Sequence, residues 1–103
     1  MTYTVVTSKK AERDMQNIAD YISDELHDVE AAFKLMLEIR MQIRQLNQMP
    51  KRYPLVSDKR LAKRGIRSFP VKNYIVFYSI DDDTKIVNIT SVMYGRRNWV
   101  NLL

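Results

Sequence analysis

The stretch that decides the fold is Gly65-Ile-Arg-Ser-Phe-Pro-Val-Lys-Asn-Tyr-Ile-Val-Phe-Tyr-Ser-Ile-Asp81. Both of its ends are rich in β-branched and aromatic residues, which favour strands. The pair Lys72-Asn73 between them is a two-residue turn. Residues 74–80 are apolar on both faces, which is typical of a central strand covered on both sides. Because Pro70 lacks an N–H for the ladder, it predicts an edge position, or an early end, for the strand that it belongs to.

Two further strands flank this stretch. The turn Asp81-Asp82-Asp83-Thr84 leads into a strand over 85–94 that Gly95 ends, and residues 96–103 follow as a short tail. Three consecutive carboxylates in a hairpin are interpreted as a solvated turn rather than a cation site. At the other end of the chain, residues 2–7 are β-branched and aromatic and predict a short opening strand.

The region between the opening strand and the hairpin has helical periodicity. Ser8 predicts an N-cap, and the apolar residues after it fall on one helix face: Ala11, Met15, Ile18, Ala19, Ile22 and Leu26. After a turn at His27, Asp28 predicts the cap of a second helix that extends to about Met49, with this apolar stripe: Val29, Ala32, Phe33, Met36, Ile39, Ile43 and Leu46. Helices joined by so short a turn lie antiparallel.

The predicted order is therefore β-α-α-β-β-β. This is an α+β fold in which a helical hairpin packs on one face of a small, mainly antiparallel sheet. The 103 residues are enough for one packed core but not for two, so a single domain is expected over 1–103. The apolar fraction of 46% and the charged fraction of 28% are those of an ordinary globular domain.

Several classes of chemistry are disfavoured by composition. The chain has no cysteine, one histidine (His27) and two glycines (Gly65 and Gly95). Thiol catalysis, sulfur-ligated zinc and multi-histidine metal sites lack their ligands, and a glycine-rich nucleotide loop lacks its glycines. We therefore expect no cofactor and no metal. With no signal-peptide stretch and no run long enough to span a bilayer, a cytoplasmic location without membrane association is expected.

Positive charge is concentrated in the second half of the chain. Residues 1–49 hold six Lys/Arg against eight Asp/Glu, whereas residues 50–103 hold eleven against four. A loop predicted over 50–64 contains six of these cations and one acid, Asp58. Like charges at this density repel each other without a partner, so the loop predicts a contact for nucleic acid, the ribosome or an acidic protein.

A series of motifs covers nearly the whole chain. They are Ala-x-x-Asp at 11–14, Ile-Ala-Asp-Tyr-Ile at 18–22, Leu-Asn-Gln-Met-Pro at 46–50, the stretch at 65–81 and Gly-Arg-Arg-Asn-Trp-Val-Asn-Leu-Leu at 95–103. In this order and spacing they resemble the RelE/ParE superfamily of toxins from type II toxin-antitoxin systems. The resemblance implies growth arrest, a role in plasmid stabilisation and a cognate antitoxin as partner.

Two activities compete within that superfamily. RelE-like members are ribosome-dependent endoribonucleases that cut mRNA, and ParE-like members inhibit DNA gyrase. The long helical hairpin, the run at 18–22 and the Leu-Leu ending resemble the ParE branch, which we favour. Moreover, the chain has no histidine near the sheet and no late tyrosine in its tail, where RelE-like enzymes carry proton-transfer groups. A RelE-like ribonuclease is the alternative, and a non-toxic basic module that binds nucleic acid is a second alternative.

Candidate site residues follow from charge and from the resemblance. For a ribonuclease, cations would stabilise the transition state and Tyr94 would transfer a proton, so the catalytic set is Arg67, Arg96, Arg97 and Tyr94. The residues expected to contact the target, whether gyrase or the ribosome with its mRNA, are Lys51, Arg52, Lys59, Arg60, Lys63, Arg64, Arg67, Arg96, Arg97 and Trp99. Leu37 and Met41 widen the apolar surface of the second helix and are expected to bind the antitoxin.

Overall fold

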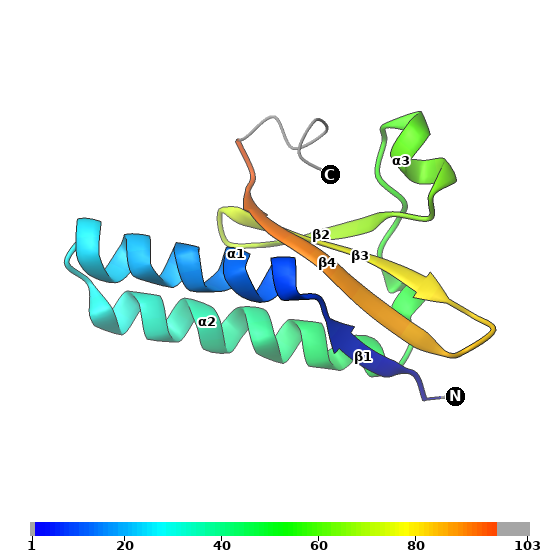
Figure 1. Cartoon of the computed structure of the whole chain (residues 1–103), viewed down its shortest axis with the longest axis horizontal. Coiled ribbons are helices and arrows are strands. Elements are labelled where there is room, and N and C mark those ends of the chain that lie inside the picture. Colours follow the sequence, from blue (N-terminus) through cyan, green and yellow to red (C-terminus); the bar gives the residue numbers. More distant parts are fainter. Residues whose placement is uncertain (1, 97–103) are drawn as a thin grey trace.

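The computed structural model describes residues 2–96 of the chain, as a four-stranded sheet with a helical hairpin against one face (Figure 1). The strands are β1 (Thr4–Thr7), β2 (Arg67–Val71), β3 (Tyr74–Asp81) and β4 (Ile86–Tyr94), and the α-helices are α1 (Lys9–Asp20), α2 (Val29–Arg44) and α3 (Lys59–Lys63). The strand order is β1-β4-β3-β2, with β1 parallel to β4 and the other pairs antiparallel. The predicted α+β class is thus confirmed, and β2, the strand that contains Pro70, lies at an edge.

Both helix caps read from the sequence are present. The Oγ atom of Ser8 accepts a hydrogen bond from the backbone N–H of Ala11 at 3.0 Å, and Asp28 Oδ1 accepts one from the N–H of Ala31 at 2.9 Å. Each cap satisfies a backbone donor that the first helical turn leaves free. The hairpin buries its apolar face against the sheet in a core made of Ala11, Met15, Ile39, Ile43, Leu46, Phe69, Val71, Val76, Tyr78, Val87, Ile89 and Val92.

The first helix does not continue as an α-helix to Leu26. It passes into a π-helical turn, η1 (Tyr21–Glu25), in which the N–H of Leu26 donates to the carbonyl of Tyr21 at 3.3 Å. The wider turn shifts the helical phase, and Leu26 is 56% exposed rather than in the core. His27 follows in the left-handed region, with φ of 54°, and reverses the chain into α2.

The predicted loop over 50–64 is only partly a loop, because it contains α3. Asp58 Oδ1 caps this short helix by accepting from the N–H groups of Arg60 and Leu61, at 3.0 and 3.1 Å. The helix is held by packing, since Leu61 is buried in a second core on the opposite face of the sheet from the hairpin. That core consists of Val56, Leu61, Ile66, Phe77 and Met93. The burial of β3 on both faces, predicted from its sequence, is confirmed by this second core.

A β-bulge at Thr90 changes the phase of β4. Phe77 pairs with Ser91 and Tyr78 pairs with Ile89, so Thr90 is the extra residue. Its Oγ1 donates to the carbonyl of Phe77 at 3.1 Å. One inserted residue turns the following side chains to the other face, which lets both Ile89 and Val92 enter the hairpin core although they are three positions apart.

Asp14 connects α1 to β4 beyond the end of β1. Its Oδ2 accepts from the N–H of Val92 at 3.0 Å and lies 3.0 Å from Lys10 Nζ, which also donates to Ser91 Oγ at 3.0 Å. Val92 is only 2% exposed, so its N–H depends on this partner.

We expect Asp14→Ala to lower the free energy of unfolding by about 2 kcal/mol, because it leaves a buried donor unpaired. Asp14→Asn is the control, since its amide oxygen can still accept from Val92, and it should lose less than about half as much. Urea unfolding followed by circular dichroism measures both. Equal losses in the two variants would mean that the negative charge of Asp14, and not the hydrogen bond that its Oδ2 accepts from Val92, stabilises the fold.

Candidate functional site

Two of the predicted target-binding cations stabilise the fold instead of projecting freely. Arg52 donates from Nη2 to the carbonyls of Gln48 and Gln45, at 2.6 and 3.1 Å, and from Nε to that of Met49 at 3.2 Å. These carbonyls lie in the segment that follows α2, so the bonds hold the Arg52 side chain against that segment. Lys51 Nζ lies 3.2 Å from a carboxylate oxygen of Asp82, in the β3–β4 turn.

Arg67 is also engaged within the chain. Its Nη1 donates to the carbonyl of Tyr53 at 2.6 Å, and it stands opposite Tyr78 in the β2–β3 ladder. The Tyr78 hydroxyl in turn donates to the carbonyl of Pro50 at 2.6 Å. Burial raises the pKa of Tyr78 to about 12, so this hydroxyl is a neutral donor at physiological pH. Arg67 and Tyr78 together fasten the segment after α2 to the sheet.

The remaining cations of the region gather on α3. Lys59, Arg60, Lys63 and Arg64 are all exposed, and we call them the α3 cationic patch. Arg60 Nε is 3.9 Å from Asp58, and the other three have no ion pair within residues 2–96. With no internal partner to neutralise them, these side chains are available to carboxylates or phosphates of another molecule.

Two of the candidate catalytic residues, Arg67 and Tyr94, are not brought together. Arg67 lies opposite Tyr78, whereas Tyr94 lies opposite Tyr74, four residues earlier in β3. At about 3.3 Å per residue, the two positions are separated by about 13 Å along the strand. The ring of Tyr94 packs edge-on against Tyr74, with centroids 5.7 Å apart.

The described end of the chain is also remote from the α3 cationic patch. Arg96 follows β4 at one end of the sheet, and α3 stands at the other (Figure 1). Arg96 and the α3 cationic patch therefore do not form one continuous cationic surface. Arg97 and Trp99 lie outside the described residues. Within residues 2–96, no group of three or more His, Cys, Asp or Glu residues could hold a metal ion, and no helix is both long and apolar enough to cross a bilayer.

An apolar ridge runs along the solvent side of α2. Leu37 and Met41, expected from the sequence to bind an antitoxin, are 55% and 48% exposed. Two residues that the sequence analysis assigned to the core face, Val29 and Phe33, are 71% and 63% exposed and extend the row at the same four-residue spacing. Both residues lie in the first half of α2, where the hairpin projects beyond the sheet (Figure 1).

We call Val29, Phe33, Leu37 and Met41 the α2 ridge. An exposed row of large apolar side chains on one helix is typical of an interaction surface. The four-residue spacing of these apolar residues could have identified the ridge from the sequence. Residues at i, i+4 and i+8 drift around the helix relative to the stripe that faces the sheet, and Ala32, Ile39 and Ile43 already fill that stripe.

Comparisons with known proteins agree with this fold. A family model described as the ParE toxin of the type II toxin-antitoxin system parDE matches residues 5–99. No curated protein sequence matches the chain. Among solved structures, the chain resembles one from the chromosomal ParDE TA system of P. aeruginosa, with a TM-score of 0.74 and 18% identity over 90% of this chain and 96% of that one.

Two RelE-type structures are also similar. A chain of the toxin-antitoxin complex RelBE2 from Mycobacterium tuberculosis has a TM-score of 0.57 and 22% identity, over 91% of this chain and 99% of that one. A mutant of the E. coli toxin RelE in the free state has a TM-score of 0.64 and 12% identity, over 99% of this chain and 93% of that one. At these identities, the likeness concerns the fold.

Proposed function

The chain belongs to the ParE toxin family of type II toxin-antitoxin systems, and from this premise we propose that it arrests growth by inhibiting DNA gyrase. The observation that carries the proposal is the separation of Arg67 from Tyr94 by about 13 Å along β3. Cleavage of RNA by 2′-hydroxyl attack needs cations and a proton-transfer group around one phosphate. Inhibition by binding has no such requirement. The proposal implies a cytoplasmic location, where gyrase acts.

The α3 cationic patch is the proposed contact with the target. Three of its four exposed cations lie on a short helix that Asp58 caps and Leu61 anchors to the sheet, and Arg64 directly follows this helix, so the charges are held on a fixed support. A fixed cationic surface attracts an acidic partner surface and increases the rate of encounter. Arg96, which follows β4, is proposed as a second contact, and Arg97 and Trp99 are proposed as contacts from the sequence alone.

The α2 ridge is the proposed binding surface for the cognate antitoxin. Toxin-antitoxin complexes among the similar structures support such a partner. The ridge is a row of residues four apart, and a helix that packs its own four-residue row against such a row crosses at about −50°. We therefore propose that an amphipathic helix of the antitoxin crosses α2 obliquely, with Phe33 and Leu37 at the centre of the contact.

The deciding experiment compares two reactions with the purified full-length chain. One is DNA supercoiling by purified gyrase, and the other is mRNA cleavage on programmed ribosomes. Inhibited supercoiling with an intact transcript supports the proposal. Cleaved mRNA with normal supercoiling contradicts it and selects the RelE-like alternative. If neither reaction changes, cells grow normally and the chain binds DNA or RNA in a salt-dependent manner, the non-toxic basic module is selected instead.

A pair of charge reversals tests the α3 cationic patch. Lys59→Glu combined with Lys63→Glu should weaken gyrase inhibition by about tenfold, the lower end of what electrostatic steering contributes. Lys9→Glu combined with Arg13→Glu is the matched control, because these are also exposed cations four residues apart on a helix. The control should inhibit like the parent chain. Equal losses in both variants would show that only net charge matters and would remove α3 from the contact.

A further inference from the structure

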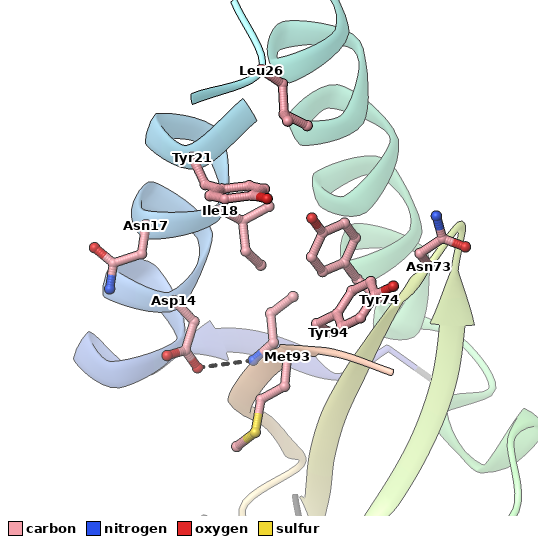
Figure 2. Close-up of a pocket in the computed structure, with 10 residues that line it drawn as sticks. Asp14, Asn17, Ile18, Tyr21, Leu26, Asn73, Tyr74, Met93 and Tyr94 are labelled. Carbon is pink, nitrogen blue, oxygen red and sulfur yellow. Dashed lines mark hydrogen bonds between the residues drawn. The ribbon is translucent and has the colours of Figure 1, made fainter. Parts of the chain in front are cut away.

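A pocket of about 620 Å³ lies between α1 with its π-helical turn and the adjoining ends of β3 and β4 (Figure 2). Three tyrosines from different elements line it, namely Tyr21, Tyr74 and Tyr94, and we call it the tyrosine pocket. Neither the α3 cationic patch nor the α2 ridge contributes a residue to it. Its volume is within the range of small-ligand sites, which are concave and aromatic with a few polar groups.

The π-helical turn is what builds one wall of this pocket. In an α-helix, residues five apart lie about 140° apart around the axis, so Tyr21 and Leu26 could not both face the same cavity. The bond from the Leu26 N–H to the Tyr21 carbonyl, at 3.3 Å, widens the turn and brings both side chains to the pocket. Such π-turns occur frequently at functional sites.

The polar groups of the pocket are free for a ligand. Within residues 2–96, the hydroxyls of Tyr21, Tyr74 and Tyr94 and the side-chain amides of Asn17 and Asn73 make no hydrogen bond, although all five line the pocket. Among the other tyrosines of the described residues, the hydroxyls of Tyr3 and Tyr78 are bonded and that of Tyr53 is not. The pKa of Tyr74 is raised, mainly by burial and further by Tyr21 and Tyr94, so its hydroxyl stays neutral. Five polar groups without a partner in the described chain therefore line one cavity, with the asparagine amides at its rim.

The aromatic faces of the lining, more than its charge, favour a cation over an anion, since the carboxylate of Asp14 is already paired with Lys10. The one charged residue among those that line the pocket is Asp14, and no Lys or Arg does. Asp14 Oδ2 is occupied by Lys10 and Val92, but its Oδ1 has no donor within residues 2–96. Aromatic ring faces attract cations, so a phosphate-bearing ligand such as a nucleotide is disfavoured.

The apolar part of the lining favours a long side chain over a compact ion. Ile18, Leu26, Val92 and Met93 complete the wall, and they match the aliphatic stem of an arginine, whose head carries the charge. The planar guanidinium stacks on aromatic faces and offers five donors, which suits tyrosine oxygens, asparagine carbonyls and a carboxylate better than the compact lysine ammonium does.

We propose that the tyrosine pocket receives an arginine side chain of the bound antitoxin. The inference rests on the proposed function for the identity of the partner. Leu26 lines the pocket and Val29 begins the α2 ridge, and three residues of chain span at most about 11 Å. One antitoxin segment can therefore occupy the ridge and the pocket together. The ridge would contribute apolar burial, and the pocket would add selectivity for a cationic residue at one position.

A titration of the isotope-labelled, full-length chain with N-acetyl-arginine amide tests the pocket directly by NMR. We expect saturable shifts of the Asn17 and Asn73 side-chain amides, and Tyr21→Leu should weaken binding about fivefold. Phe33→Leu, which changes an exposed aromatic residue elsewhere, should bind like the parent chain. N-acetyl-norleucine amide has a similar stem without the charge and should not saturate.

Three results would overturn the inference: no saturation with the arginine probe, equal shifts with the norleucine probe, or tighter binding of adenosine monophosphate, which would indicate a nucleotide site. Because the titration needs neither gyrase nor antitoxin, its failure is distinguishable from failure of the proposed function. With the antitoxin itself, Tyr21→Leu should weaken binding about fivefold while gyrase inhibition is unchanged. Unchanged antitoxin affinity would remove the antitoxin as the source of the arginine.

Discussion

Replacing Phe33 and Leu37 by aspartate is expected to leave a folded, toxic chain that the cognate antitoxin no longer rescues. The two side chains are 63% and 55% exposed, so the free chain loses little packing. In the proposed complex both would be buried, and burying each is worth about 1.5–3 kcal/mol. Losing both predicts an antitoxin Kd that rises by about a thousandfold, since each 1.4 kcal/mol is a factor of ten.

The measurement is antitoxin affinity by calorimetry, together with colony counts after co-expression. The control is Phe33→Leu with Leu37→Met, which keeps apolar side chains of similar volume and should preserve rescue. Thermal unfolding of both variants checks that they fold. If the aspartate variant were folded and still rescued, the α2 ridge would not be the antitoxin surface. The antitoxin would then bind on another face, such as the free edge of β1.

Phe69→Ala is expected to have the largest effect on stability, lowering the free energy of unfolding by about 3–5 kcal/mol. Phe69 is 1% exposed, stacks on Tyr53 with ring centroids 4.5 Å apart and meets Tyr78 edge-on at 6.0 Å. The loss would be a large share of the total stability of a small domain, which is about 5–15 kcal/mol. The ring joins the edge strand β2 to the segment after α2, so its removal weakens both.

Phe33→Ala is the matched control, because it removes the same side chain from an exposed helix position. It should change the free energy of unfolding by less than about 0.5 kcal/mol. If Phe69→Ala does not fold, Phe69→Leu should still fold and lose about 1 kcal/mol in guanidinium unfolding. A loss in Phe69→Ala no greater than that in Phe33→Ala would mean that the aromatic group around Phe69 does not stabilise the sheet.

Local signals predicted most of the fold. Ser8 and Asp28 correctly predicted where the two helices start, because an N-cap side chain bonds to a backbone N–H only three residues away. Pro70 correctly predicted an edge strand, because proline has no N–H to donate in any surroundings. The apolar run over 74–80 correctly predicted a strand that is buried on both faces. Each of these predictions depends on only a few residues that are close together in the sequence.

The irregular features were not predicted, because each depends on partners far away in the chain. The helix α3 forms because Leu61 has a pocket against Phe77 and Met93, and five residues would not form a stable helix alone. The bulge at Thr90 was indicated only by apolar residues three apart, at Ile89 and Val92. The π-helical turn that begins at Tyr21 could not be predicted, because the spacing of apolar residues around it also fits a regular α-helix.

The candidate site shows the same division. The sequence shows six cations over 50–64, but it does not reveal that Arg52 binds carbonyls of the segment after α2, or that Lys51 pairs with Asp82 in a turn thirty-one positions away. Arg67 was expected from the sequence to contact the target, and in the structure its Nη1 donates to the carbonyl of Tyr53. Only the residues of α3 retain the free charge that the count suggested.

The sequence by itself determined the class of fold, the helical hairpin, the central strand and the absence of cysteine chemistry, since these follow from residue types and from short-range periodicity. Tertiary structure alone decided which cations are free, which apolar residues of α2 face solvent and which tyrosines meet in one pocket. The physical reason is that a charge or a ring acquires its role from what lies within a few ångströms of it. For Asp14 and Val92, or Arg67 and Tyr53, that neighbour is set by packing and not by position in the chain.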